Sequence, residues 1–239
     1  MIWSTLLVGC SDTKPTGRLP TPDRALLEQA IASATPSTVK IKGSACGLAT
    51  AGSGVVVAAH LVLTAAHVVA GATESEVVDS AGEHRAIPVV VDPLSDMAVL
   101  YVEALSDPPV EINDHAASRG TVGVVLGYPH GGNLQVTPTV VLDNYRADSH
   151  DIYGQQSIVR QILEVQAQIL PGLSGGPFVD SQGMLIGMVF GQSEAVPDVG
   201  YTLTAPAIRE LVDAGLGATD AGQTAVSTGA CLPPGTQQS

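Results

Sequence analysis

Three short segments of this 239-residue chain carry the side-chain types that acyl transfer requires, and they follow one another in the order His, Asp, Ser. Leu61–Val69 has the pattern of a strand leading into a turn of small residues that presents His67. Asp96 precedes an apolar strand, and Ser174 lies within the glycine-rich segment Gly172–Pro177. A serine hydrolase needs a nucleophile, a general base and an acid that orients the base. The three segments together therefore predict a serine hydrolase.

Each segment alone has an ordinary explanation, because a lone His, a strand-edge Asp and a Gly-flanked Ser are common in cores and turns. Asp92 is a rival to Asp96, but its position fits a turn better. The other histidines show no metal-ligand spacing and are expected in surface or loop roles; they are His60, His84, His115, His130 and His150. No metal and no cofactor is therefore expected.

The chain order of these residues excludes one class of hydrolase. Gly172–Gly176 also satisfies the Gly-x-Ser-x-Gly elbow of α/β-hydrolases, which need the order Ser, acid, His and a helix after the Ser. The last histidine is His150, before Ser174, and Pro177–Val179 begins a strand. The lipase-type interpretation fails on both points.

The elements that must position these residues are short apolar segments separated by Gly, Pro, Asn and Asp, the pattern of an all-β barrel or sandwich. A break at Ser106–Pro109 divides them into halves of about 36–110 and 118–204, without an internal sequence repeat. The predicted strands are Val39–Ile41, Gly54–Ala58, Leu61–Thr64, Ile87–Val91, Ala98–Val102, Thr121–Gly127, Val136–Leu142, Ser157–Ala167, Pro177–Val179, Leu185–Phe190 and Gly200–Thr204.

Two short helices flank the β segments. The first is predicted to begin at Thr21–Asp23, with a cap and an early Pro, and to end at Thr35. The second is predicted over Thr204–Ala214 and to end at Gly215. One domain over 36–214 would follow residues 11–35, a tether and helix, and precede a tail over 215–239.

Residues 1–10 end in Leu7-Val8-Gly9-Cys10, which resembles the lipobox of bacterial lipoproteins and predicts lipid on Cys10. The alternative is that the sequence begins inside a longer signal or membrane segment. Both interpretations place the folded body outside the cytoplasm, where disulfides form. Lipidation of Cys10 would leave Cys46 and Cys231 as a pair whose bridge closes a loop of roughly 185 residues. The alternative is two buried free thiols.

Composition limits the partners of the chain. Ten Lys and Arg against 23 Asp and Glu give a net charge of −13, which argues against nucleic acid and anionic lipid surfaces. Hydrophobic residues make up 45% of the chain, so a large core can form. No charge-free apolar run reaches the roughly 18–20 residues of a membrane helix.

The order of the segments resembles that of the chymotrypsin-like, trypsin-fold serine proteases. Thr64–His67, Asp96–Leu100 and Gly172–Pro177 match the His, Asp and Ser motifs of that family. Over roughly 36–232 the chain is most similar to the protease domain of actinobacterial MarP-type envelope proteases. Further markers of this branch are Ala45–Gly47, Gly127–Gly132, Asp151–Tyr153, Val189–Gly191 and Cys231. The resemblance implies two six-stranded antiparallel β-barrels with the active site between them, and a disulfide between the two later cysteines.

The resemblance also implies a role for each motif residue. His67 would be the general base, oriented by Asp96, so activity is expected to fall below roughly pH 6–7 as His67 becomes protonated. Backbone N–H groups of Gly172 and Ser174 would form the oxyanion hole. The substrate backbone would pair along Phe190 and Gly191. Gln168 would form the floor of the primary pocket, where no charge selects Lys or Arg.

Two departures from the wider family are visible. Leu173 stands where digestive members carry an acid, so their activation switch is expected to be absent. Residues 215–239 are too few for the PDZ domain of HtrA-type relatives. The sequence thus predicts a serine endopeptidase acting on protein or peptide substrates outside the cytoplasm, with membrane anchoring through Cys10. The alternatives are a catalytically inactive trypsin-fold binding or chaperone module and an esterase on the same residues.

Overall fold

The computed structural model describes residues 19–220 and 222–232. The predicted lipidation of Cys10 and most of the predicted tether lie outside these residues. Within the described part, no helix is both long and apolar enough to cross a membrane.

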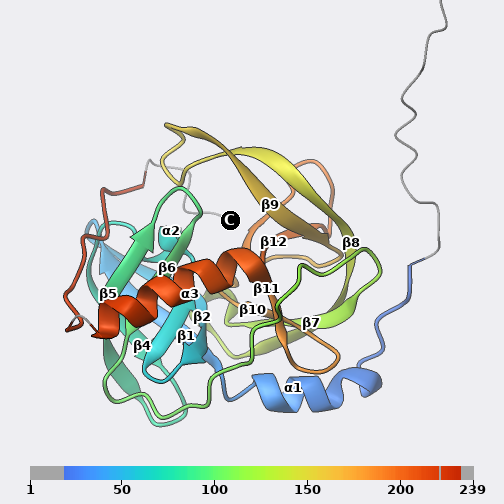
Figure 1. The fold of residues 1–239 in the computed structure, drawn as a ribbon, viewed down its shortest axis with the longest axis horizontal. Helices are drawn as coiled ribbons and strands as arrows, with labels where there is room; N and C mark the ends of the chain where they lie inside the picture. The colour runs from blue at the N-terminus through green and yellow to red at the C-terminus, as the bar shows by residue number, and fades with distance from the viewer. Residues whose placement is uncertain (1–18, 221, 233–239) are drawn as a thin grey trace, which may run out of the picture.

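Two closed antiparallel barrels of six strands each form the body of the protein, and they lie side by side in Figure 1. The first contains β1 (Thr38–Ala45), β2 (Leu48–Ala58), β3 (Leu61–Thr64), β4 (Ala72–Val78), β5 (Glu83–Asp92) and β6 (Met97–Tyr101). The second contains β7 (Val122–Gly127), β8 (Gln135–His150), β9 (Ser157–Val165), β10 (Pro177–Asp180), β11 (Leu185–Gln192) and β12 (Gly200–Thr204). Numbered within each barrel, the strand order is 1-2-3-6-5-4 in both, so the halves repeat in topology although not in sequence. The predicted all-β, two-barrel fold is confirmed.

The sequence pattern missed one strand, β4. Its residues alternate between exposed polar side chains and the buried Ser75 and Val77, which gives no run of apolar residues to detect. β4 nevertheless pairs with both β1 and β5, and these ladders close the first barrel. Pairing with neighbours distant in sequence here determines the structure more than local composition does.

The N-terminal helix begins later than predicted. A 3₁₀ turn at Ala25–Leu27 leads into α1 (Glu28–Ala34), and the N-cap position of the turn is Arg24, which makes no side-chain capping bond. The Asp23 Oδ1 accepts the Ala25 N–H at 2.9 Å just before the turn. The helical segment therefore begins after the predicted start at Thr21–Asp23. The helix packs its buried face against β7 and β10 of the second barrel.

The C-terminal helix α3 is longer than predicted and runs over Ala205–Asp220. Gly215 does not end it: a Cβ there would lie 2.9 Å from Val99 Cγ1 of β6, so the glycine allows the helix to cross the sheet closely. α3 packs on β5 and β6 of the first barrel and on β11 and β12 of the second. It lies across both barrels in Figure 1.

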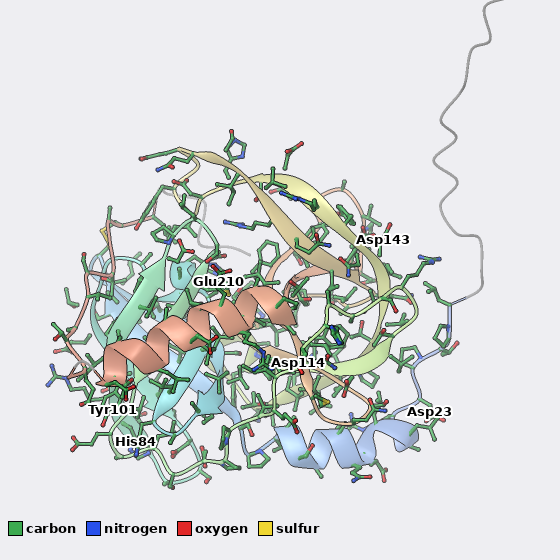
Figure 2. The ribbon with its side chains drawn as sticks, in the orientation of Figure 1. Asp23, His84, Tyr101, Asp114, Asp143 and Glu210 are labelled. Atoms are coloured by element: carbon green, nitrogen blue, oxygen red, sulfur yellow. A yellow bond between two sulfur atoms is a disulfide. The ribbon has the colours of Figure 1, made fainter. Side chains whose placement is uncertain are left out.

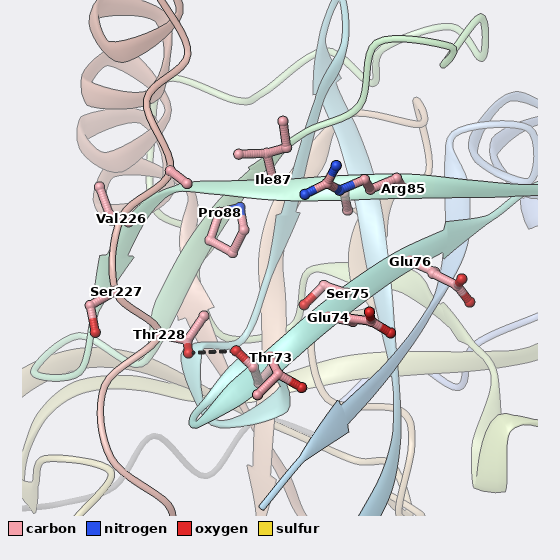
Figure 3. Close-up of a pocket in the computed structure, with 13 residues that line it drawn as sticks. Thr73, Glu74, Ser75, Glu76, Arg85, Ile87, Pro88, Val226, Ser227 and Thr228 are labelled. Carbon is pink, nitrogen blue, oxygen red and sulfur yellow. Dashed lines mark hydrogen bonds between the residues drawn. The ribbon is translucent and has the colours of Figure 1, made fainter.

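Residues 225–232, here called the C-terminal strap, follow the edge of the first barrel. The Val226 N–H donates to Pro88 O at 2.9 Å, and Thr228 Oγ1 donates to Ala72 O at 2.9 Å. Figure 3 shows this part of the strap beside β4 and β5, around a cavity of about 530 Å³. The strap ends in the disulfide between Cys46 and Cys231, so the predicted pairing is present and neither thiol is free.

The surface acids come from many elements. Asp23 precedes α1, and Asp114 follows the first barrel. Asp143 lies on β8 and Glu210 on α3, and the four residues are spread across the view in Figure 2.

Candidate active site

His67 lies in α2 (Ala66–Val69), a single helical turn directly after β3. The sequence pattern predicted a turn here, and the turn is helical. β3 pairs with β2 and β6 and is completely buried, while Ala65 and Ala66 leave no exposed surface. Small residues are required at Ala65 and Ala66 because the start of α2 is packed inside the core, whereas His67 lies at the cleft.

Asp96 reaches His67 from the turn between β5 and β6. Its φ of 59° is in the left-handed region, which Asp tolerates better than most residues. One carboxylate oxygen, Oδ2, lies 2.8 Å from His67 Nδ1, and Oδ1 accepts the His67 backbone N–H at 3.0 Å. An acceptor at Nδ1 keeps the proton on that nitrogen and leaves Nε2 able to accept one.

Opposing effects act on the pKa of His67. Burial, the largest, lowers it; the charge of Asp96 and its hydrogen bond raise it; and the positive charge of Arg160 lowers it. The effects of Asp96 prevail together, so the pKa of His67 lies above the ordinary value of 6.5. The imidazolium that forms when a nucleophile loses its proton is therefore stabilised in this site.

Arg160 is a site residue that the sequence pattern did not reveal. It is 8% exposed and meets no carboxylate at ion-pair distance among the described residues. Its guanidinium instead donates to the carbonyl oxygens of Leu94 (2.6 Å) and His150 (3.0 Å) and lies 5.6 Å from the centre of the Phe190 ring. Arg160 is the one basic residue of β9, which also contains Gln161 and Glu164, so the strand gives only a weak signal for it.

The loop that carries Ser174 requires glycine at two positions. Gly172 has φ of +93°, and a Cβ there would lie 2.7 Å from His130 N and from Tyr128 O. Gly175 has φ of +85°, and a Cβ there would lie 2.1 Å from Ser53 O. Gly172 is thus needed for close approach to the segment after β7, and Gly175 for close approach to β2 of the first barrel.

The side chain of Leu173 points away from the cleft. It is 1% exposed and belongs to the core of the second barrel, where it packs with Phe178 and Ile186. An apolar residue at this position anchors the loop by burial, whereas a carboxylate would have to be neutralised there.

Ser53 of β2 connects the first barrel to this loop, and the sequence pattern did not single it out. The side chain is completely buried; its Oγ donates to Gly172 O at 2.7 Å and accepts the Tyr128 N–H at 2.8 Å. Its backbone N–H donates to Ser174 O at 2.9 Å, and its carbonyl accepts the Thr64 hydroxyl at 2.7 Å. Every polar group of Ser53 therefore holds a segment of the active site.

Two cavities meet at His67. The larger, of about 330 Å³, is lined by His67, Ser174, Gly172, His130 and their neighbours Ala49–Ala51, Val68 and Pro171. The smaller, of about 160 Å³, is lined by His67, Asp96, His150–Ile152, Arg160, Phe190 and Leu232. We refer to these as the loop cavity and the strap cavity.

Most of the predicted site residues meet at these cavities. A Cβ at Gly191 would have no atom within 4 Å, so the end of β11 beside Phe190 borders open space. Gln168 is exposed and lines neither cavity; its role as a pocket floor stays a prediction. His130 and His150 border the cavities, which their expected surface or loop roles did not indicate.

The remaining candidates have local partners. His84 Nε2 lies 3.0 Å from Asp79 Oδ1, and His60 Nδ1 lies 3.3 Å from Val102 O. Asp92 Oδ1 accepts the Leu94 N–H at 3.0 Å, as a turn residue does. Among the described residues, no three His, Cys, Asp or Glu side chains gather in a way that could hold a metal.

Two closed barrels, a His–Asp pair from the first and a Ser-bearing glycine loop from the second define a chymotrypsin-like serine protease. The sequence model of the Trypsin-like peptidase domain matches residues 52–188. The chain belongs to this family of trypsin-like peptidases.

Named relatives agree with this assignment. The chain is 36% identical over 215 residues to Serine protease Rv3671c of Mycobacterium tuberculosis, and this match covers 88% of the chain and 53% of the relative. It thus spans about half the length of that relative. It is 32% identical over 123 residues to a Probable periplasmic serine endoprotease DegP-like of Pseudomonas putida, covering 51% of this chain and 24% of that protein.

Solved structures show the same fold. The crystal structure of the Rv3671c protease in its active form matches with a TM-score of 0.83 and 33% identity, over 95% of this chain and 100% of that one. The structure titled as the inactive form matches with a TM-score of 0.73 and 35% identity, over 83% and 99% of the two chains.

Proposed function

We propose that this chain is a serine endopeptidase in which Ser174 is the nucleophile, His67 the general base and Asp96 the residue that orients the base. The observation that carries the proposal is the placement of both Asp96 carboxylate oxygens on His67, while Ser174 borders the same cavity as the imidazole. The similarity of the fold to the crystal structure of the Rv3671c protease in its active form supports it.

The first half of the reaction forms an acyl-enzyme. Ser174 Oγ attacks the substrate carbonyl while its proton passes to His67 Nε2, and the imidazolium is stabilised by Asp96. The negative charge that develops on the carbonyl oxygen is met by the backbone N–H groups of Gly172 and Ser174. The C–N bond then breaks, and His67 gives its proton to the leaving amine.

The second half releases the acyl group. A water molecule loses a proton to His67 and attacks the ester carbonyl, and the oxyanion forms in the same place. The C–Oγ bond breaks, His67 returns the proton to Ser174, and the carboxylic acid product leaves. The enzyme is regenerated without a cofactor in either step.

We place the reaction outside the cytoplasm. The disulfide between Cys46 and Cys231 favours an oxidising compartment, and one relative is described as periplasmic. Anchoring through lipid on Cys10 remains part of the proposal, and mass spectrometry of the membrane-extracted protein tests it.

The second candidate function is an inactive trypsin-fold module that only binds peptides. A fluorophosphonate probe distinguishes the two, because it modifies only a serine that is activated as a nucleophile. We expect the probe to label the wild type and not the Ser174→Ala variant, and casein or peptide hydrolysis to disappear with it. Absence of labelling in a well-folded wild type would refute the enzyme. Ester turnover without peptide turnover would favour the esterase.

A further inference from the structure

The last described residue of the C-terminal strap, Leu232, lies inside the catalytic cleft. It is 8% exposed and lines the strap cavity together with His67, Asp96 and Phe190. The chain reaches this position from the far edge of the first barrel, so a residue distant in sequence from the His, Asp and Ser motifs forms part of the site.

Covalent and hydrogen-bonded anchors fix the strap just before Leu232. Cys231 is bonded to Cys46, and Tyr153 Oη donates to Ala230 O at 3.4 Å. The Gly71 N–H, a few residues after His67, donates to Thr228 O at 3.1 Å. A side chain held in this way can serve as a fixed wall.

The strap cavity lies on the acyl side of the scissile bond in the proposed mechanism. His67 separates it from the loop cavity, which contains Ser174 and the oxyanion loop. Phe190 lines the strap cavity, and Phe190–Gly191 is the strand edge on which the acyl part of a substrate would pair. The strap cavity therefore faces the substrate segment before the bond.

The position that enters the cavity follows from strand geometry. Side chains of an extended peptide alternate between the two faces, so neighbouring residues point in opposite directions. If the residue next to the bond points into the primary pocket, the second residue before the bond points toward His67. That second side chain would meet the strap cavity.

Two of the charged groups that line this cavity already have hydrogen-bond partners. Arg160 donates to the carbonyls of Leu94 and His150, and Asp151 Oδ1 accepts the backbone N–H groups of Tyr153 (3.2 Å) and Gln155 (2.7 Å). The Phe190 ring, Leu232 and the half-buried Ile152 complete the walls of a cavity whose exposed lining is mostly polar. Because its volume is only about 160 Å³, the cavity selects by size and admits a small side chain best.

We propose that Leu232 is a specificity-determining residue: it closes the subsite for the second residue before the scissile bond and limits the size of the side chain accepted there. The inference rests on the proposed endopeptidase function, and it assigns to the strap a part in substrate choice.

The test compares peptide substrates that differ only at the second position before the bond, with Ala, Leu or Phe there. Leu232→Ala enlarges the subsite, and a mismatch of one methylene between a side chain and its pocket changes selectivity by about tenfold or more. We expect kcat/KM for the Leu and Phe peptides to rise about tenfold relative to the Ala peptide. Leu232→Phe is expected to shift the ratio the opposite way. Val226→Ala, an exposed strap residue outside the cleft, is the control and leaves the ratio unchanged.

Active-site titration with a fluorophosphonate accompanies each measurement and counts the folded, reactive molecules. Unchanged ratios in both Leu232 variants at full titration would overturn the inference while the endopeptidase stands. An equal acceleration of all three peptides, reproduced by a chain ending at Leu232, would show that the tail blocks the cleft and would also overturn it. Failure of the wild type to titrate would refute the proposed function itself.

Discussion

Replacing Ser53 by Ala removes one oxygen atom from the completely buried contact between the barrels. Gly172 O then loses a donor at 2.7 Å, and the Tyr128 N–H loses an acceptor at 2.8 Å. Each buried polar group without a partner costs about 1–3 kcal/mol, so the loss of two partners is expected to lower the unfolding free energy by about 2–6 kcal/mol. A loose oxyanion loop adds a catalytic loss, because a misplacement of about 1 Å can cost roughly 10²-fold.

The assay separates these two effects. Urea unfolding gives the stability, and steady-state kinetics on a peptide, normalised by fluorophosphonate titration, gives kcat and KM. We expect kcat to fall about 10–100-fold with little change in KM, because the oxyanion is met only in the transition state. Ser75→Ala, another buried serine but on β4 away from the loop, is the matched control and should keep kcat. A Ser53 variant with kcat within twofold of the wild type would refute the positioning argument.

Three further outcomes are expected. Gly172→Ala should lower kcat about 10²–10³-fold, because the clash of its Cβ with His130 N and Tyr128 O displaces an oxyanion donor. Gly222→Ala, at a similar φ of +106° in open space, should keep kcat; equal losses would contradict the assignment. Because the pKa of His67 is raised and only its neutral form accepts a proton, activity should fall with decreasing pH at a midpoint above 6.5; a midpoint below 6.5 would oppose it. Replacing Cys46 and Cys231 by Ser opens a loop spanning 185 residues and should lower the unfolding free energy by about 5 kcal/mol at most; unchanged denaturation midpoints would show that the bridge adds nothing.

The sequence predicted those features whose information is local. The motifs around His67, Asp96 and Ser174 each occupy a few consecutive residues, and eleven of the twelve strands have a local apolar pattern. The His–Asp contact lies where their order implied. Local pattern and tertiary structure agree at these positions, as expected where each segment is consistent with the fold.

The supporting residues could not be predicted in the same way. Ser53 acts on a carbonyl 119 residues away, and Arg160 acts on one 66 residues away. Neither separation leaves a pattern in a single sequence. Gly215 misled because a glycine that ends a helix and a glycine that lets a helix approach a strand look alike. Only the position of Val99 distinguishes them.

The disulfide makes nearly the whole folded body one covalent ring. Cys46 lies at the end of β1 and Cys231 at the end of the strap, so both barrels, apart from β1, and α3 belong to the ring. A single cut in any exposed loop between these cysteines would open the ring without releasing a fragment. A protease that cuts its own loops would thus keep its two halves joined, and the cut would become visible as two fragments only after reduction.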